Sequence, residues 1–329
     1  MAEFEVIDKY FNFGHSGFNT SKRVIKSIGD DCAILDVPKK SKLVTSTDTL
    51  IEGVHFFSDV AAADLAYKAL AVNVSDLAAM GAKPLAFTLA ITLPETDSSW
   101  LSEFSRSLKQ ASKQFDIPLV GGDTTQGYNA QSGISITISV FGTVKKEKVL
   151  LRDTAKQDQD IWITGYLGNA AAALALHGKE RLNEQQKYLW QQLVKPSINH
   201  KFSRKLTKYC QCAIDVSDGL LADLGHIIVQ SKVGAKVNVE ALPLSDALID
   251  EVGIEEARQY ALTGGDDYQL CFVADRKWRN SIHNLAERYD VSVSRIGKIV
   301  EQGMHIILED KPLAITKNSW QHFKKQSCY

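Results

Sequence analysis

The sequence has few cysteines, and their spacing is not that of a metal site. The five cysteines of the 329-residue chain are Cys32, Cys210, Cys212, Cys271 and Cys328. They form no C-x-x-C pair, so zinc is not indicated, and structural disulfides are not expected. Cys210 and Cys212 form a C-x-C pair, which leaves a redox or metal role open, but buried or half-buried reduced thiols are the favoured interpretation.

The sequence also lacks an excess of positive charge and any long apolar run. Lys and Arg number 38 against 39 Asp and Glu, so no general field attracts nucleic acid or an anionic membrane. No apolar run approaches the roughly 18 residues of a membrane span, and the first residues carry acids where a secretory signal has basic and apolar ones. These absences predict a cytoplasmic protein that acts on small molecules, without nucleic-acid or membrane partners.

The familiar nucleotide-binding signatures are missing as well. No G-x-x-x-x-G-K-[ST] occurs, which excludes a P-loop. Gly165-Tyr-Leu-Gly168 precedes an alanine-rich segment but lacks the G-x-G core of a dinucleotide site. Tight packing of a strand against a helix is therefore the favoured role for these glycines.

Length and composition predict two globular α/β domains. With 44% hydrophobic and 23% charged residues, the composition is that of an ordinary folded protein, and the length exceeds that of a single core. The polar segment 145–160 suggests a boundary, giving domains of residues 1–150 and 151–329.

Periodicity predicts a mixture of helices and strands in both halves. The segment 42–48 is expected to be a strand that ends on Asp48 and presents its polar groups there. Residues 64–80 are expected to form a largely buried helix. Further strands are predicted at 87–93, 134–144, 161–164, 213–216, 236–240, 268–274 and 305–309, and further helices at 100–115, 165–176 and 220–230.

The most informative feature is a set of acids embedded among Gly, Ser and Thr. These clusters are Gly29-Asp30-Asp31, Ser46-Thr47-Asp48, Ser75-Asp76, Gly121-Gly122-Asp123, Asp215-Val216-Ser217-Asp218 and Gly264-Gly265-Asp266-Asp267. Several follow strand-like segments, and strand ends in α/β folds point into one crevice. If the acids converge, their repulsion requires cations, and oxygen ligands suit Mg²⁺. Magnesium in turn suggests phosphates.

Each cluster taken singly is more simply interpreted as a turn or a helix cap. That interpretation is weaker for Asp76, which lies in an otherwise apolar helical pattern with Asn73 on the same face. An acid in such a helix needs a partner or a metal. The glycines beside Asp123 and Asp266 could let the backbone approach a phosphate.

The motifs together resemble the thiamine-monophosphate kinase family. They are Ile28-Gly-Asp-Asp-Cys-Ala33, Ser46-Thr-Asp-Thr49, Asn73-Val-Ser-Asp-Leu-Ala-Ala-Met-Gly81, Gly121-Gly-Asp-Thr-Thr125, Ile214-Asp-Val-Ser-Asp-Gly-Leu220 and Thr263-Gly-Gly-Asp-Asp-Tyr268. They occur in the family's order, and the resemblance covers about residues 29–320.

The resemblance implies a fold shared with aminoimidazole ribonucleotide synthetase and selenophosphate synthetase. In that fold an N-terminal α/β domain pairs in a homodimer through a shared β-barrel, and a C-terminal α/β domain completes the site. The implied reaction transfers the γ-phosphate of ATP to thiamine monophosphate, with several Mg²⁺ ions per site.

The resemblance also implies roles for individual residues. The implied Mg²⁺ ligands are Asp30, Asp31, Ser46, Thr47, Asp48, Asp76, Asp123, Asp215 and Asp218, among which Asp48, Asp76, Asp123 and Asp215 are expected to carry catalysis. The implied ATP residues are Gly122, Asp123, Arg152 and Ser217, and the implied substrate residues are His55, Asp266 and Trp320. Plainer alternatives are a packed histidine for His55, a solvated cation for Arg152 and a surface anchor for Trp320.

Three segments depart from the family's pattern. Gly264-Gly-Asp-Asp-Tyr268 has Asp266 where the family usually has glutamate, which shortens the acid by one methylene. Lys195-Pro-Ser-Ile-Asn-His200 lacks the usual arginine, and Gln157-Asp-Gln-Asp160 replaces the usual Pro-Gly-Asp. None of these departures removes an implied metal ligand.

The expected chemistry depends on positioning and electrostatics. The acceptor phosphate has a second pKa near ~6 and is largely ionised at neutral pH, so a dedicated general base is unnecessary. Direct in-line transfer is therefore expected. Two alternatives stay open: a related synthetase with another acceptor, such as formylglycinamidine ribonucleotide or selenide, and a non-catalytic protein that binds Mg²⁺ and nucleotide.

Overall fold

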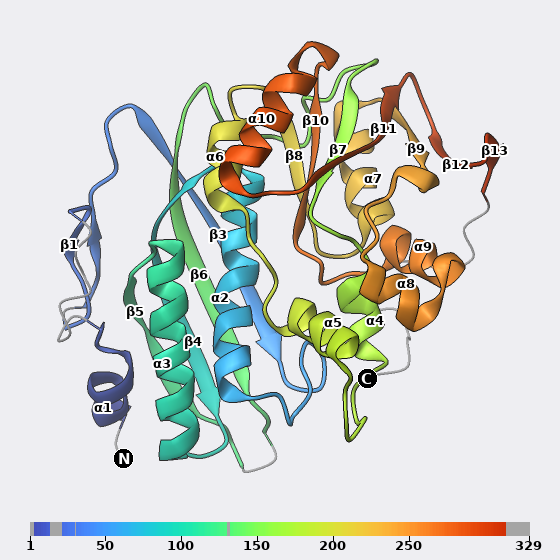
Figure 1. The fold of residues 1–329 in the computed structure, drawn as a ribbon. Helices are drawn as coiled ribbons and strands as arrows, with labels where there is room; N and C mark the ends of the chain where they lie inside the picture. The colour runs from blue at the N-terminus through green and yellow to red at the C-terminus, as the bar shows by residue number, and fades with distance from the viewer. Residues whose placement is uncertain (1–2, 14–21, 30, 130–131, 314–329) are drawn as a thin grey trace. The chain divides into compact units, whose positions relative to one another are not determined.

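The structure is a computed structural model, and it describes residues 3–13, 22–29, 31–129 and 132–313 (Figure 1). These residues form two compact units. The first holds the described residues up to Leu77 together with Ala82–Lys146, and the second holds Ala78–Gly81 and the residues from Glu147 onward. Both units mix helices with strands, which confirms the predicted α/β class. Within the described ranges, no helix is both long enough and apolar enough to cross a membrane.

The first unit is built on a four-stranded sheet with the order β3-β6-β4-β5. Its strands are β3 (Ser41–Ile51), β6 (Ser135–Lys145), β4 (Lys83–Leu93) and β5 (Leu119–Gln126). β6 pairs antiparallel with both β3 and β4, and β5 pairs parallel with β4. Helices α2 (Ala62–Ala79) and α3 (Ser98–Phe115) cover one face (Figure 1). The short segments α1 (Glu3–Val6) and η1 (Ile7–Phe11) precede this layer.

Local sequence explains why the helices of this unit lie where they do. α2 consists mainly of Ala, Leu and Val, which favour a helix and bury readily. α3 begins after Asp97, whose carboxylate accepts the backbone N–H groups of Ser99 and Trp100. It ends at Asp116, which adopts the left-handed conformation.

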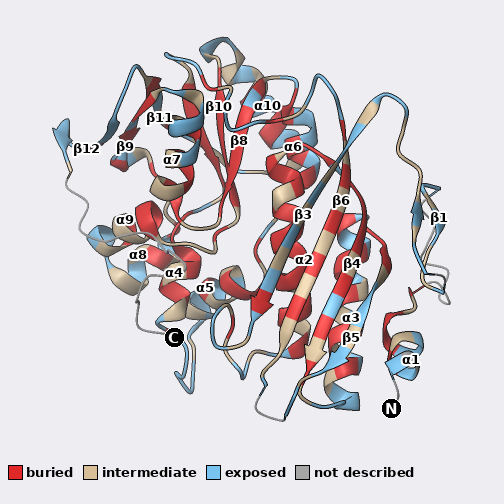
Figure 2. Cartoon of the chain, turned by 180° about the vertical axis from the view of Figure 1, so that it is seen from behind, coloured by how far each residue is buried: buried red, intermediate tan, exposed pale blue. Residues whose placement is uncertain are grey.

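The opposite face of the sheet is largely open. Figure 2 shows it from that side, with no described helix of this unit in front of it. The hairpin of β1 (Val24–Lys26) and β2 (Ile34–Leu35) packs on part of the sheet, where Val24, Leu35 and Phe141 belong to one apolar cluster. Residues of β6 alternate between buried and half-buried, as expected for a sheet covered on one face only.

The predicted end of the first strand was wrong. The sequence suggested a strand that stops at Asp48, but β3 continues to Ile51 and pairs with β6 along its full length. Thr49, Leu50 and Ile51 continue the alternation of exposed and buried side chains, so the sheet extends past the acid. Asp48 therefore lies inside a strand.

The second unit contains a seven-stranded sheet with the order β13-β12-β9-β11-β7-β10-β8. In that order the strands are Lys311–Pro312, Met304–Leu308, Gly234–Asn238, Val293–Val300, Asp160–Thr164, Gln269–Ala274 and Cys210–Val216. β7 and β10 are buried along their whole length. Such continuous burial is expected for central strands that are covered on both faces.

Helices cover both faces of this sheet. One apolar cluster includes side chains of α7 (Leu220–Ser231) and α9 (Ile254–Thr263), and another includes those of α6 (His200–Leu206) and α10 (Arg279–Tyr289). A third cluster joins α4 (Asn169–Leu174), α5 (Glu184–Val194) and α8 (Asp246–Val252). Two short 3-10 turns, η3 (Val239–Ala241) and η4 (Arg276–Trp278), complete the described elements.

The prediction of buried or half-buried thiols is confirmed for three cysteines and is wrong for Cys32. Cys210, Cys212 and Cys271 are free and buried, whereas Cys32 is free and exposed. Burial raises the pKa of all three buried thiols, that of Cys212 to about 12. A thiol with so high a pKa is unreactive. Cys328 lies outside the described residues.

Candidate functional site

The candidate residues from the sequence fall into two sets, one in each unit. The first unit contains Asp31, Ser46, Thr47, Asp48, His55, Asp76, Gly122 and Asp123, and the second contains Arg152, Asp215, Ser217, Asp218 and Asp266. Asp30 and Trp320 lie outside the described residues.

In the first unit, strand β3 and helix α2 bring three candidates together. Ser46 donates a hydrogen bond from its hydroxyl to the carboxylate of Asp76. The backbone N–H of Asp48 donates to Oδ1 of Asn73 at 3.1 Å, and Nδ2 of Asn73 donates to the carbonyl of Ala69 at 2.9 Å. Asn73 therefore links the strand to the helix, and Asp76 follows it by one turn.

Thr47 does not join this group. Side chains alternate along a strand, so Thr47 lies on the opposite face from Ser46 and Asp48. Its hydroxyl is exposed and lies 2.8 Å from that of Ser139 on β6. The structure thus places the side chain of Thr47 apart from the two neighbours with which it was predicted to bind metal.

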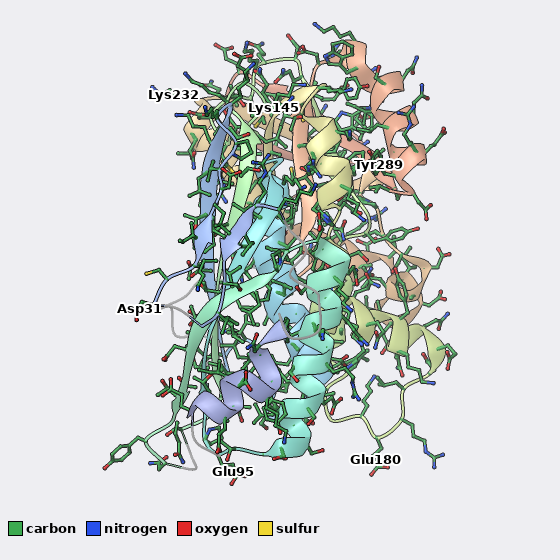
Figure 3. All side chains as sticks on the ribbon, turned by 90° about the vertical axis from the view of Figure 1, so that its left-hand side faces the viewer. Asp31, Glu95, Lys145, Glu180, Lys232 and Tyr289 are labelled. Carbon is green, nitrogen blue, oxygen red and sulfur yellow. The ribbon has the colours of Figure 1, made fainter. Side chains whose placement is uncertain are left out.

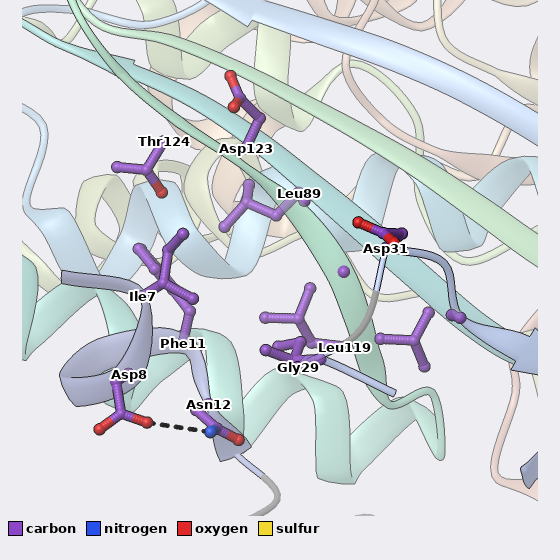
Figure 4. A pocket seen from close by; sticks show the side chains of 15 residues that line it. Ile7, Asp8, Phe11, Asn12, Gly29, Asp31, Leu89, Leu119, Asp123 and Thr124 are labelled. Atoms are coloured by element: carbon purple, nitrogen blue, oxygen red, sulfur yellow. Dashed lines mark hydrogen bonds between the residues drawn. The ribbon is translucent and has the colours of Figure 1, made fainter. Parts of the chain in front are cut away.

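Strand β5 positions Gly122 and Asp123 beside a cavity. The cavity has a volume of about 700 Å³, and its wall includes Asp31 and the apolar side chains of Ile7 and Phe11 (Figure 4). The carboxylate of Asp123 is exposed and accepts a hydrogen bond from the hydroxyl of Thr125 at 2.8 Å. Asp31 is also exposed, as Figure 3 shows at the edge of the unit.

Gly122 is required by the sheet itself. A Cβ atom at this position would lie 1.8 Å from the carbonyl oxygen of Leu89 on the neighbouring strand. No side chain can occupy that space, so the glycine lets β5 pair closely with β4. The cluster lies inside a strand rather than in the turn that its glycines suggested.

His55 follows β3 and folds back onto it. The ring Nδ1 of His55 accepts the backbone N–H of Ile51 at 3.0 Å, and the backbone N–H of His55 donates to the carbonyl of Ile51 at 2.9 Å. Because Nδ1 is an acceptor, the neutral ring carries its proton on Nε2. His55 is half-buried rather than packed in the core.

In the second unit, Asp215 lies near the end of β8, as the sequence predicted, and it is only 5% exposed. Ser217 and Asp218 follow in the loop that leads to α7, and both are half-buried. The nearby Asp223 on α7 accepts with Oδ2 the backbone N–H groups of Ser217, Asp218 and Gly219, at 3.0, 3.0 and 3.2 Å.

The loop 263–268 packs directly on this loop. The backbone N–H of Asp266 donates to the carbonyl of Ser217, and that of Tyr268 donates to the carbonyl of Val216, both at 2.8 Å. A Cβ atom on Gly265 would lie 2.5 Å from the carbonyl oxygen of Ser217. The glycine is therefore needed for close contact between the two loops.

Asp266 and Tyr268 both have left-handed backbone conformations, with φ of 67° and 49°. Such a conformation is unfavourable for a bulky side chain, and it is found where the surrounding structure enforces it. The hydroxyl of Tyr268 donates to the carboxylate of Asp266 at 3.1 Å.

Asp267, between them, has a different environment. It is buried, and its carboxylate accepts the backbone N–H of Gly168 at 2.6 Å and that of Ala170 at 3.4 Å. Gly168 has φ of 86°, and a Cβ atom there would lie 2.8 Å from the backbone of Ala261. Gly168 thus has a packing role, as predicted, but the element that it packs on is helix α9 rather than a strand.

Burial and nearby like charges raise the pKa of both Asp223 and Asp267, two acids to which the sequence analysis gave no role. Burial raises the pKa of Asp223 to about 7, and the nearby carboxylates of Asp215 and Asp218 raise it further. Burial likewise raises the pKa of Asp267 to about 7, with a smaller effect from Asp266. The sequence signal that could have identified Asp223 is an acid one turn into an otherwise mostly apolar helix.

Arg152 has an anchored backbone and an exposed side chain. Its carbonyl accepts a hydrogen bond from the hydroxyl of Ser231 at 2.9 Å. This geometry holds the loop against α7 and leaves the guanidinium group accessible to an anion.

The donor atoms of both sets suit magnesium. They are carboxylate and hydroxyl oxygens, the hard ligands that Mg²⁺ prefers. Among the described residues, no group of three or more His, Cys, Asp or Glu side chains is arranged to hold a metal. Mg²⁺ is commonly held by one or two carboxylates together with substrate phosphates and water, so these oxygens fit an ion that arrives with a phosphate.

Comparison with known proteins identifies the class first. The model of the AIR synthase related protein N-terminal domain matches residues 29–144, and that of the corresponding C-terminal domain matches residues 156–309. The chain therefore has the two-domain architecture of AIR synthase related proteins, as the motifs predicted.

Individual relatives identify the family within this class of proteins. The thiamine-monophosphate kinase of Buchnera aphidicola subsp. Schizaphis graminum is 40% identical over 326 residues, which cover 98% of each chain. The crystal structure of thiamine-monophosphate kinase from Stenotrophomonas maltophilia K279a is 41% identical, with a TM-score of 0.85 over 93% of this chain and 96% of that one. AaThiL complexed with AMPPCP and TMP is 30% identical, with a TM-score of 0.75 over 91% and 92%. The chain belongs to the thiamine-monophosphate kinase family.

Asp267 gives a prediction for the dependence of stability on pH. A carboxyl group whose pKa is raised on folding stabilises the fold most below its unfolded pKa, and this contribution is lost as pH rises through the folded pKa. For Asp267 the two values are 3.8 and about 7. We therefore expect the wild-type free energy of unfolding to fall between these pH values, and the fall to be smaller in Asp267→Asn.

Urea unfolding followed by circular dichroism, in the presence of a chelator, measures this effect. The exposed Asp246 provides a control, because Asp246→Asn should keep the wild-type dependence. Parallel pH profiles for Asp267→Asn and the wild type would contradict the assignment.

Proposed function

We propose that this protein transfers the γ-phosphate of ATP to thiamine monophosphate, giving thiamine diphosphate and ADP. The observation that carries the proposal is the end-to-end similarity to thiamine-monophosphate kinases, at 40% identity over 98% of each chain. The site geometry agrees with it, because the described residues of both units present carboxylates beside hydroxyl groups, as at Ser46 and Asp76 and at Ser217 and Asp218.

ATP is proposed to bind beside β5. The cavity of about 700 Å³ combines apolar side chains, such as Ile7 and Phe11, with Gly122 and Asp123. Such a mixture suits a nucleotide, whose base is flat and whose ribose and phosphates are polar. Arg152 and Ser217 of the second unit are also proposed to be ATP residues, and the accessible guanidinium of Arg152 is suited to bidentate phosphate binding.

Magnesium is proposed to be held by the acids of both units. The proposed ligands are Asp30, Asp31, Ser46, Asp48, Asp76, Asp123, Asp215 and Asp218, together with Thr47 through its backbone carbonyl. When bound, the ions supply positive charge that offsets the repulsion between the two phosphate substrates.

The chain's own residues position the reactants. The acceptor phosphate is already ionised at neutral pH, so no residue is needed to remove a proton from it. The hydrogen bond from Ser46 holds the carboxylate of Asp76 in one orientation. His55 is proposed to donate from Nε2 to the substrate, because its Nδ1 is occupied by the backbone of Ile51. Asp266, oriented by Tyr268, and Trp320 are proposed to contact the thiamine moiety.

The direct test measures ADP release with ATP and Mg²⁺ and compares thiamine monophosphate with free thiamine as acceptor. We expect release with the monophosphate only. A related synthetase would instead release ADP with formylglycinamidine ribonucleotide, or AMP and phosphate with selenide. A non-catalytic binding protein would bind Mg-ATP in a calorimeter and release no ADP with any of these acceptors.

Asp76→Asn and Asp123→Asn test the proposed roles of the carboxylates. Each change removes a negative charge with little change in shape, so the fold should persist while turnover falls at least ~100-fold, as expected for lost electrostatic stabilisation. Steady-state ADP release measures turnover, and circular dichroism checks the fold. Asp116→Asn, an exposed position in the same unit, should keep wild-type turnover. Near-normal turnover in Asp76→Asn or Asp123→Asn would refute that residue's role.

A homodimer is proposed to form through the open face of the four-stranded sheet. This face presents Leu43 and Ile51, which are 49% and 44% exposed, beside the paired hydroxyls of Thr49 and Thr137. A second copy of the same face would bury these groups.

Light scattering should therefore give twice the mass of the chain. Thr49→Arg should yield a monomer, because a buried unpaired charge opposes association. Ser102→Arg, on the exposed side of α3, should stay dimeric. A dimeric Thr49→Arg protein would place the interface elsewhere.

A further inference from the structure

Asp223, in the second unit, accepts several hydrogen bonds from a single loop. It is 3% exposed and lies in the first turns of α7. A single oxygen, Oδ2, accepts three consecutive backbone N–H groups, those of Ser217, Asp218 and Gly219. Three bonds to one atom fix the curvature of the loop far more tightly than one helix-capping bond does.

The same loop carries or adjoins the acids proposed as metal ligands. Asp218 lies within the loop, and Asp215 precedes it by two residues on β8. The outer side of the loop is also used, because the carbonyl of Ser217 accepts the N–H of Asp266. The carboxylate of Asp223 thus holds the loop from within, and the loop in turn holds the backbone of Asp266.

Placing a carboxylate here has an electrostatic cost. Asp215 and Asp218 both lie close enough to act on Asp223 and to oppose its ionisation. A neutral Asn could accept the same three N–H groups without that repulsion. The position of the accepting oxygen therefore matters more for the loop than the charge that it carries.

We propose that Asp223 is a positioning residue, which sets the orientation of Asp215 and Asp218 for divalent-ion binding by fixing the backbone of residues 217–219. This inference rests on the proposed function, since that function makes Asp215 and Asp218 magnesium ligands. The role assigned to Asp223 is that of holding the loop, because its Oδ2 accepts all three N–H groups.

Two conservative variants separate geometry from charge. Asp223→Asn removes the charge and keeps an oxygen at the same reach, so the three N–H groups still have an acceptor. Asp223→Glu keeps the charge and moves the oxygen by one methylene, so the loop must shift. Asp223→Leu removes both.

The experiment titrates the full-length protein with Mn²⁺ in the presence of a non-hydrolysable ATP analogue. Free Mn²⁺ is measured by electron paramagnetic resonance, and ADP release is measured in parallel with Mg²⁺. We expect Asp223→Leu and Asp223→Glu to bind Mn²⁺ about 10–100-fold more weakly, the usual effect of losing a group that orients metal ligands. Asp223→Asn should retain most of the wild-type affinity.

Asp160→Asn is the matched control. Asp160 lies in the same unit, is 2% exposed, and accepts hydrogen bonds from Arg279 at 2.6 and 2.7 Å. It pairs with one end of β10, at Ala274, whereas Asp215 pairs near the other end, at Leu270. Its loss should lower the melting temperature without changing Mn²⁺ affinity.

Two results would overturn the proposal. Wild-type Mn²⁺ affinity in Asp223→Glu, or in a folded Asp223→Leu protein, would reduce Asp223 to a helix cap. Weaker binding in Asp223→Asn than in Asp223→Glu would mean that charge matters rather than geometry. A wild-type protein that binds Mn²⁺ and releases no ADP would contradict the proposed function alone, because the order of affinities among the variants can still be measured.

Discussion

Carboxylates that are partly buried repel one another, and each must be held by hydrogen bonds if it is to keep a fixed place. The fold meets this constraint differently in the two units. In the first, the hydroxyl of Ser46 on a strand holds Asp76 on a helix. In the second, Asp223 accepts the backbone N–H groups of the loop that carries Asp218, and Asp267 accepts those of the turn at Gly168 and Ala170. The acids proposed to bind metal and substrate are therefore different residues from the acids that hold loops, although Asp267 lies in the same motif as Asp266.

The alternation of side chains along a strand decides which candidates can act together. Ser46 and Asp48 share the face of β3 that meets α2, whereas Thr47 lies on the opposite face beside Ser139. A motif of three consecutive residues in a strand cannot direct all three side chains to one ion. If Thr47 does bind metal, its backbone carbonyl is the better candidate atom.

Much of the fold was visible in the sequence, because strong local patterns and packing agreed. The alanine- and leucine-rich α2, the β-branched β6 and the acid at the end of β8 were predicted from periodicity alone. β11 was missed, since Gly297 interrupts its pattern, and that glycine is needed because a Cβ atom would lie 2.1 Å from the carbonyl of Lys236. Asp223 was missed because its role depends on a loop that bends back toward it, and such curvature leaves no periodic signal. The substrate assignments came from the resemblance, and local physics alone would have left turns and caps as the simpler explanation.

The central claim is that acids distant in the sequence bind divalent ions together with the phosphates of the substrates. Anomalous diffraction from crystals grown with Mn²⁺, a non-hydrolysable ATP analogue and thiamine monophosphate tests it most directly. The account predicts manganese peaks within bonding distance of the carboxylates of Asp76 and Asp215 and of the phosphate oxygens. Manganese bound to neither carboxylate, with both substrates present, would contradict it.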